Sequence, residues 1–86
     1  MNKRFVYFYF MRDRPEKIRQ AVQTHVDYWR ELNLNNYTGG PFSDRSGGLI
    51  TFETISLEKA TQIVSKDSFV KGDLIENKWL KEWLVE

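Results

Sequence analysis

The most constraining feature of this chain is an aromatic stretch near its start, Arg4 to Met11, which reads RFVYFYFM. Val, Phe and Tyr favour extended backbone, so the stretch is predicted to be a β-strand. Alternate residues of a strand point to opposite faces, and here both sets are apolar or aromatic. An edge strand with one face in water would alternate with polar residues. We therefore expect a central strand that is covered on both sides.

A helix is predicted from Glu16 to about Leu32, because apolar residues recur there at helical spacing and form one buried stripe. The stripe consists of Ile18, Ala21, Val22, Val26, Trp29 and Leu32. Asp13 is the expected N-cap, with Pro15 just inside the helix and Glu16 three positions after the cap.

Two further strands are predicted in the middle of the chain, Tyr37 to Phe42 and Leu49 to Ile55. The segment between them, Ser43 to Gly48, is rich in Ser and Gly and is predicted to form a turn or hairpin loop.

Ser56 is the expected N-cap of a second helix that runs to about Lys66. Its predicted apolar face contains Leu57, Ala60, Ile63 and Val64. We expect the segment from Asp67 to Gly72 to be irregular. The tail from Leu74 to Val85 fits either a helix or a strand by spacing, and we predict a strand because the sheet otherwise lacks its closing partner.

These elements give the order βαββαβ in a single domain over residues 1–86, which predicts an α+β fold of the ferredoxin-like kind. Two helices would cover one face of a four-stranded antiparallel sheet. The other face would carry an aromatic row, and soluble proteins rarely expose apolar patches of that size. A second copy of the chain stacked on this face would bury it, so we expect a homodimer.

Composition excludes several function classes. The 86 residues contain 13 basic and 12 acidic side chains, which is not the cationic excess that nucleic-acid binding needs. There is no cysteine, so disulfides and thiol chemistry are excluded. No apolar run approaches the roughly 20 residues of a membrane span, and the aromatic start lacks a signal-peptide cleavage site. We therefore expect a cytoplasmic protein that binds neither membranes nor nucleic acid.

His25 is the single histidine, and it lies near the middle of the predicted buried stripe, between Val22, Trp29 and Leu32. A titratable group in that place is costly unless it finds a partner. It is either a core histidine that bonds a backbone carbonyl, or a catalytic or ligand-binding group. One histidine cannot build a zinc site, so no metal is predicted.

No cofactor is predicted either. The glycine pairs Gly39-Gly40 and Gly47-Gly48 are not phosphate-binding loops, because no Lys-Ser/Thr follows either pair and neither opens a helix. Asp13, Asp44 and Asp67, taken alone, suit capping and turn positions.

Taken together, these residues resemble the YCII-related family of small proteins over nearly the whole chain. The resemblance is carried by Asp13, the run His25-Val26-Asp27-Tyr28-Trp29 with Leu32, Gly40-Pro41, Asp44, Gly47-Gly48 before Leu49-Ile50-Thr51-Phe52, Ser56 to Ala60, Asp67-Ser68-Phe69, Gly72 and Trp83. At two positions this sequence departs from the family pattern: Val22 stands where relatives commonly carry arginine, and Ser68 where proline is usual.

The resemblance implies the fold of the dimeric α+β barrels and an active site made of a histidine–aspartate pair, which would be His25 and Asp67 here. A carboxylate bonded to one imidazole nitrogen fixes the tautomer and leaves the other nitrogen as a general base or acid. One relative is described as removing chloride from a hydroxylated aromatic ring. The expected ligand-binding residues are Gly40, Pro41, Phe69, Tyr9, Trp29 and Asp44.

Three hypotheses about function follow. The first is a cofactor-independent enzyme of the lyase or hydrolase type that uses His25 and Asp67 for proton transfer on a small, cyclic or aromatic substrate. The second is a non-catalytic protein that binds a small-molecule ligand in the same pocket. The third is a structural dimer in which His25 is a core residue.

Overall fold

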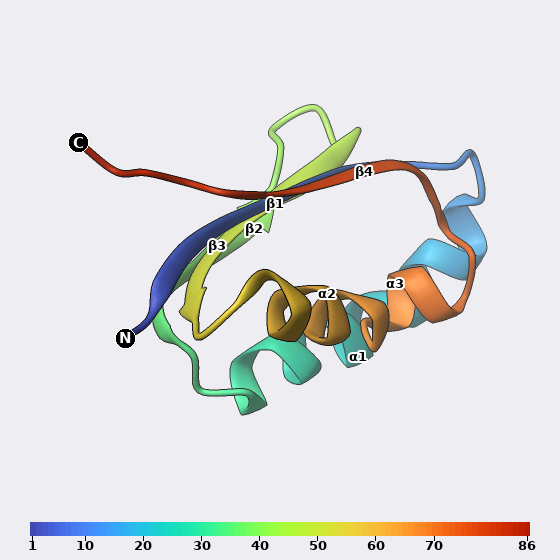
Figure 1. Ribbon diagram of the computed structural model, residues 1–86. Coiled ribbons are helices and arrows are strands. Elements are labelled where there is room, and N and C mark those ends of the chain that lie inside the picture. Colours follow the sequence, from blue (N-terminus) through green and yellow to red (C-terminus); the bar gives the residue numbers. More distant parts are fainter.

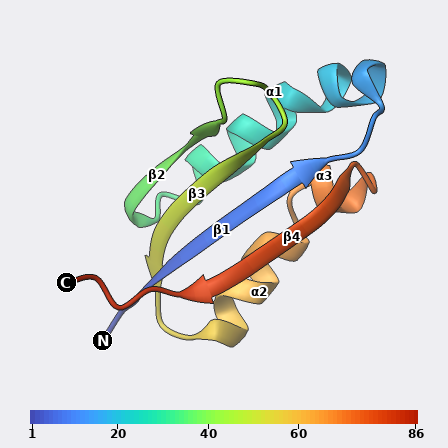
Figure 2. The same cartoon turned by 90° about the horizontal axis from the view of Figure 1, so that it is seen from above.

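The first strand lies in the middle of a four-stranded antiparallel sheet in the computed structural model, which describes residues 1–86. The strand order is β2-β3-β1-β4 (Figures 1 and 2). The elements are β1 (Lys3–Met11), α1 (Pro15–Glu31), β2 (Asn35–Pro41), β3 (Gly47–Thr54), α2 (Leu57–Ser65), α3 (Ser68–Lys71) and β4 (Ile75–Glu82). The predicted α+β, ferredoxin-like βαββαβ fold is confirmed, with α3 as an addition.

All helices lie on one face of the sheet, as Figure 1 shows, with α1 behind β2 and β3 and α2 behind β1 and β4 in Figure 2. The residues of β1 that point toward the helices, Phe5, Tyr7 and Tyr9, are buried. Trp29 of α1 packs its indole beside Tyr7, with ring centroids 6.1 Å apart. The core is therefore an aromatic layer between β1 and α1.

The start of α1 differs from the prediction. The N-cap is Arg14, which makes no side-chain capping bond, and Pro15 occupies the first turn. Asp13 is wrongly predicted as the cap, because a tight bend in which the Arg14 amide bonds the Arg12 carbonyl (2.9 Å) places Asp13 one residue too early. Pro15 has no N–H, so it removes one of the unpaired donors of this helix start, and its fixed φ suits the first turn.

α2 begins as predicted, since the Ser56 hydroxyl accepts a hydrogen bond from the Lys59 amide at 3.1 Å. Ala60, Ile63 and Val64 are buried. Leu57 is wrongly assigned to the buried face, since this first residue of α2 is 53% exposed. Val22 of α1 is also wrongly assigned to the core, since it is 42% exposed at the edge of the helix's buried face.

The segment after α2 is not irregular. Asp67 caps a short helix, α3, by accepting a hydrogen bond from the Phe69 amide at 3.0 Å. The chain then turns at Gly72 and enters β4, which confirms the predicted closing strand. α3 brings Asp67 and Phe69 beneath the sheet, where both are buried.

The second face of the sheet has no helix over it (Figure 1). It carries Val6, Phe8 and Phe10 of β1, and Phe8 stacks on Trp79 of β4 with centroids 5.1 Å apart. Within one chain the helices cover only one face of β1, and the predicted cover of the other face would come from a second copy of the chain.

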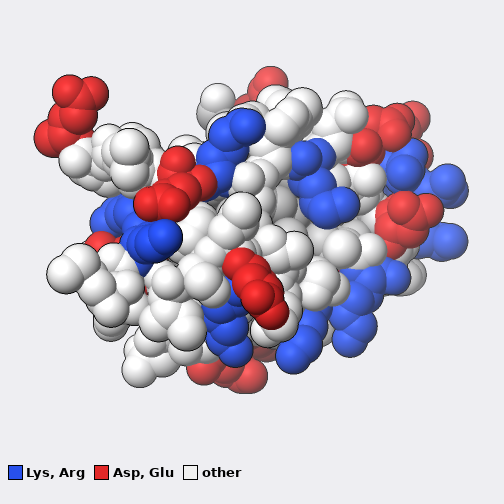
Figure 3. Space-filling model, viewed as in Figure 1, with Lys and Arg blue, Asp and Glu red and all other residues white.

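Basic and acidic side chains are interspersed over the side of the molecule drawn in Figure 3, without a large region of one sign. None of the helices is both long and apolar enough to cross a membrane.

One buried polar group in the core lacks a partner. The Tyr7 hydroxyl is inaccessible to solvent and forms no hydrogen bond. Burial, and next the negative charge of Asp67, raises the pKa of Tyr7 far above its usual value. The hydroxyl of Tyr28, by contrast, donates to the Ile63 carbonyl at 2.6 Å. These two tyrosines form a matched pair for mutation.

We expect Tyr7→Phe to raise the free energy of unfolding by about 1 kcal/mol, because an unsatisfied buried hydroxyl is removed. Tyr28→Phe should lower it by about 1 kcal/mol, because the Ile63 carbonyl loses its partner. Urea denaturation followed by circular dichroism at one protein concentration measures both. Equal losses in the two variants would mean that the Tyr7 hydroxyl has a bonding partner in solution.

Candidate active site

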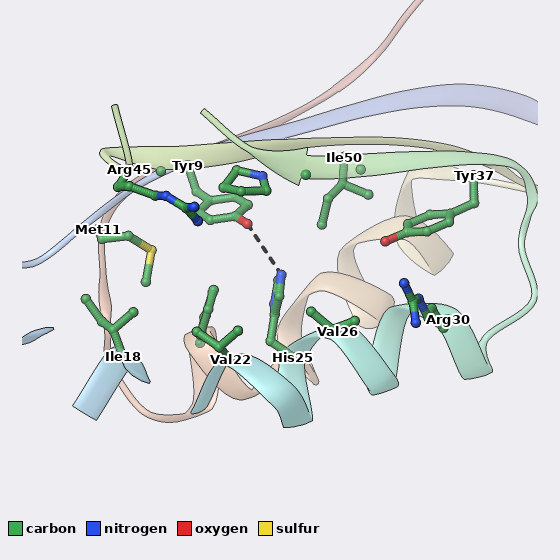
Figure 4. A pocket seen from close by; sticks show the side chains of 15 residues that line it. Tyr9, Met11, Ile18, Val22, His25, Val26, Arg30, Tyr37, Arg45 and Ile50 are labelled. Carbon is green, nitrogen blue, oxygen red and sulfur yellow. Dashed lines mark hydrogen bonds between the residues drawn. The ribbon is translucent and has the colours of Figure 1, made fainter. Parts of the chain in front are cut away.

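A cavity of about 370 Å³ lies between α1 and the sheet (Figure 4). Its wall is mostly apolar with a few polar groups, as is usual for a small-molecule site. The lining residues are Tyr9, Met11, Ile18, Val22, His25, Val26, Arg30, Tyr37, Gly39, Gly40, Pro41, Arg45, Gly47, Ile50 and Phe69. They come from β1, α1, β2, the β2–β3 hairpin, β3 and α3, so the cavity exists only in the complete fold.

His25 points from α1 toward the sheet and is 9% exposed (Figure 4). It is four residues before Trp29, so the helical repeat places both side chains on the buried face of α1. The imidazole stacks on the Phe69 ring, with centroids 4.0 Å apart and planes within 9° of parallel. This stacking fixes the plane of the imidazole at the cavity wall.

Asp67 is completely buried and is the partner of His25. Its Oδ1 lies 2.7 Å from Nδ1 of His25 and accepts a second hydrogen bond from the Phe69 amide at 3.0 Å. Its Oδ2 accepts a hydrogen bond from Nε1 of Trp29 at 3.1 Å. Three donors thus compensate for the loss of water around the carboxylate.

The pairing determines which imidazole nitrogen is free. An ionised carboxylate only accepts hydrogen bonds, so Nδ1 must carry the proton that bonds Asp67. Nε2 of neutral His25 then has a lone pair directed toward the cavity. The geometry is that of an oriented general base, in which the carboxylate also stabilises the imidazolium after proton uptake.

Tyr9 is the nearest hydroxyl to that lone pair. Its oxygen lies 3.4 Å from Nε2, a long hydrogen bond that a ligand atom could replace. Burial, and next the charge of Asp67, raises the pKa of Tyr9 well above the usual value. Tyr9 therefore remains a neutral phenol at physiological pH and can donate a hydrogen bond to an oxygen atom in the cavity.

The Gly47-Gly48 pair makes room for Tyr9. A Cβ on Gly48 would lie 2.5 Å from the Tyr9 hydroxyl oxygen, and a Cβ on Gly47 would lie 1.8 Å from the Tyr9 carbonyl oxygen. Any side chain at these positions would therefore displace Tyr9 from His25. The two glycines permit close packing of β3 on β1.

Four of the residues expected to bind a ligand lie on the cavity wall: Gly40, Pro41, Phe69 and Tyr9. Trp29 does not line the cavity, because it lies behind the His25–Asp67 pair as a donor to the carboxylate. Asp44 does not line it either. Its carboxylate accepts bonds from the Ser46 amide (2.9 Å) and hydroxyl (2.6 Å) in the hairpin loop, and these bonds lower the pKa of Asp44.

Several lining residues were not singled out from the sequence, and Arg30, Arg45 and Tyr37 are the polar ones among them. Arg30 has a helical position near the end of α1 that resembles any exposed basic residue. Arg45 lies in a turn whose path cannot be deduced from residue order. No cluster of three or more His, Cys, Asp or Glu side chains is arranged to hold a metal ion.

We expect Asp67→Ala to lower the free energy of unfolding by about 3 kcal/mol, because it leaves three buried donors without an acceptor. The matched control is Asp27→Ala on the exposed side of α1, where the carboxylate accepts one bond from Gln23 and the loss should stay below about 0.5 kcal/mol. Chemical denaturation of both variants measures the difference. Similar losses in the two variants would contradict the proposed importance of the buried network.

Comparison with solved structures finds the same fold in proteins of low sequence identity. A 5-chloro-2-hydroxyhydroquinone dehydrochlorinase (TftG) from Burkholderia phenoliruptrix AC1100, in complex with 2,5-dihydroxybenzoquinone, aligns with a TM-score of 0.83 and 19% identity over 96% of this chain and 95% of that one. A dimeric ferredoxin-like protein of unknown function from Thermobifida fusca aligns with a TM-score of 0.57 and 10% identity over 99% and 92%.

A search of curated proteins finds no match. The family comparison is decisive, because residues 5–84 match the model of the YCII-related domain. The buried pair of His25 and Asp67 thus lies in a chain that belongs to the YCII-related family.

Proposed function

We propose that this protein is a cofactor-independent enzyme that moves protons on a small, hydroxylated ring substrate. The observation that carries the proposal is the buried Asp67 carboxylate, 2.7 Å from Nδ1 of His25, which leaves Nε2 free at the wall of a cavity. His25 is the general base and acid. Asp67 orients His25 and stabilises its charged form.

The cavity wall suits a flat ring with a hydroxyl group. Phe69 and Tyr9 provide aromatic surface beside His25, and their rings meet edge to face with centroids 6.2 Å apart. A substrate hydroxyl that replaces Tyr9 as the partner of Nε2 would give up its proton to His25. The neutral Tyr9 hydroxyl could then donate to the resulting oxyanion and stabilise it.

The named reaction of the dehydrochlorinase relative requires only such proton transfers. A chlorinated trihydroxybenzene that loses HCl becomes a hydroxyquinone: two protons leave hydroxyl oxygens, one of them is added to the carbon that carries chlorine, and chloride departs with its bonding electrons. The ring is its own oxidant and reductant, so no cofactor is needed. We propose a reaction of this class, an elimination or isomerisation, for the present chain.

The alternative in which His25 merely fills the core is less well supported. His25 borders a cavity, and its Nδ1 bonds a carboxylate that Trp29 and the Phe69 amide also bind. A core histidine would need only one acceptor. A ligand-binding protein without turnover would use the same pocket, and the experiment below separates it from an enzyme.

The functional unit proposed here is a homodimer. Aromatic and apolar side chains on the helix-free face remain exposed to 37% for Phe10, 39% for Leu49 and 40% for Trp79. A second sheet packed against this face would bury them. The relative from Thermobifida fusca is described as dimeric, which supports the same arrangement here.

We expect His25→Gln to reduce turnover of 5-chloro-2-hydroxyhydroquinone or a related polyhydroxylated ring by about 10²–10⁴-fold, because the general base is lost. Anaerobic assays of chloride release and quinone absorbance measure this. Thr24→Gln, one residue earlier on the exposed side of α1, is the matched control and should retain activity.

His25→Leu tests the core alternative. If this variant is as stable as the wild type or more so, and His25→Gln keeps its activity, His25 is a packing residue and the enzyme proposal is wrong. If 2,5-dihydroxybenzoquinone binds to the wild type but none of the polyhydroxylated rings tested is converted, the protein is a ligand-binding module.

For the dimer, we expect sedimentation of the wild type at twice the chain mass of 10.3 kDa. Trp79→Glu should shift it to the monomer mass, because a charge on the contact face would have to be buried. Lys17→Glu on α1, on the opposite side of the molecule, is the control. A wild type that sediments at 10.3 kDa at micromolar concentration would contradict the proposal.

A further inference from the structure

The cavity is lined by positive charge alone. Among its lining residues, Arg30 and Arg45 are cationic and none is Asp or Glu. Neither arginine has a carboxylate within ion-pair distance, although Arg4, Arg12 and Arg19 each do. A cavity that gathers unpaired arginines without a counter-ion is suited to an anionic ligand.

Arg45 occupies its place against a conformational preference. Its φ is +65°, in the left-handed region that favours Gly or Asn over a long side chain. The hairpin loop holds it there, since the Arg45 amide donates to the Phe42 carbonyl (2.9 Å) and the Asp44 carboxylate accepts from Ser46 on the other side. Backbone strain of this kind is common at functional positions, which points to a use for the Arg45 guanidinium.

The two arginines flank His25. Figure 4 shows Arg45 on the sheet side near Tyr9 and Met11, and Arg30 farther along α1 beneath Tyr37, with His25 between them. Arg30 is five residues after His25 on the same helix, which places its backbone about 7.5 Å along the axis. The positive charge of Arg30 acts on the cavity wall, because it opposes the increase in the pKa of Tyr37 that burial causes.

From this arrangement we infer that the substrate is an anion, a ring with a phenolate, enolate or carboxylate group, and that Arg45 binds the negative group while the ring reaches His25. Arg30 adds positive charge at the other end of the cavity. The inference rests on the proposed function for the role of His25, but it concerns binding and can be tested without turnover.

The probe is 2,5-dihydroxybenzoquinone, whose two hydroxyl groups are vinylogous acids and are ionised at neutral pH. Its neutral counterpart is 2,5-dimethoxybenzoquinone. We expect the wild type to bind the anionic ring at least tenfold more tightly, measured by titration calorimetry or quenching of tryptophan fluorescence. Added salt should weaken binding of the anionic ring only.

Arg45→Asn is the decisive variant, because Asn tolerates the left-handed backbone and carries no charge. We expect about a tenfold to hundredfold loss of affinity for the anionic ring, as for a lost charge-assisted hydrogen bond, with thermal stability equal to or above that of the wild type. Arg14→Asn is the matched control: Arg14 also lacks a carboxylate partner but lies outside the cavity, at the N-cap of α1, where Asn is favoured.

Any of four results would overturn the inference: equal affinity for both rings, binding of neither ring, unchanged affinity in Arg45→Asn, or the same loss of affinity in Arg14→Asn. The failure of the proposed function is distinguishable. If Arg45→Asn loses affinity for the anionic ring while His25→Gln keeps full turnover, the inference about anion binding is supported and the proposed role of His25 is wrong. If His25→Gln abolishes turnover but Arg45→Asn binds the anionic ring as tightly as the wild type, the role of His25 is supported and the inference about Arg45 is wrong.

Discussion

The carboxylate of Asp67 is the interaction on which the rest of this structure depends. It is fully buried, and an ion of this kind is tolerated only where donors replace water. Those donors come from two parts of the chain: His25 and Trp29 from α1, and the Phe69 amide from α3. One group therefore caps α3, ties it to α1 and orients the imidazole.

The same network explains why the site residues are aromatic. Phe69 stacks on His25 and Trp29 lies behind the carboxylate, so polar atoms are held by flat apolar neighbours that admit little water. A carboxylate so enclosed interacts strongly with the imidazole it orients. The layer between β1 and α1 is thus both the core of the fold and the support of the candidate active site.

Much of the fold could be predicted from periodicity. The β-favouring residues of Arg4 to Met11 predict β1, and the spacing of apolar residues predicts α1 and α2. The short helix α3 cannot be predicted from periodicity, because four residues carry no periodic pattern. Its geometry comes from the Asp67 cap and from tertiary contacts such as the bond from the Ser68 hydroxyl to the Ala21 carbonyl. Asp13 has the residue type of an N-cap, and residue type alone does not show the bend at Arg12–Arg14 that places it outside the helix.

The site was harder to predict than the fold. His25 stood out as a titratable residue on a buried stripe, but its partner lies 42 residues away and was named only through the family resemblance. Arg45 cannot be predicted from the sequence as a cavity residue, since the direction of its side chain depends on a left-handed turn.

β1 lies between β3 and β4 in the sheet. Its two neighbours lie far along the chain, with Tyr9 pairing with Gly48 on one side and Lys78 on the other, so forming the sheet around Tyr9 closes two long loops at a cost in chain entropy. The cavity beside Tyr9 is therefore a product of these long-range pairings, and β1 and α1 alone would not enclose it.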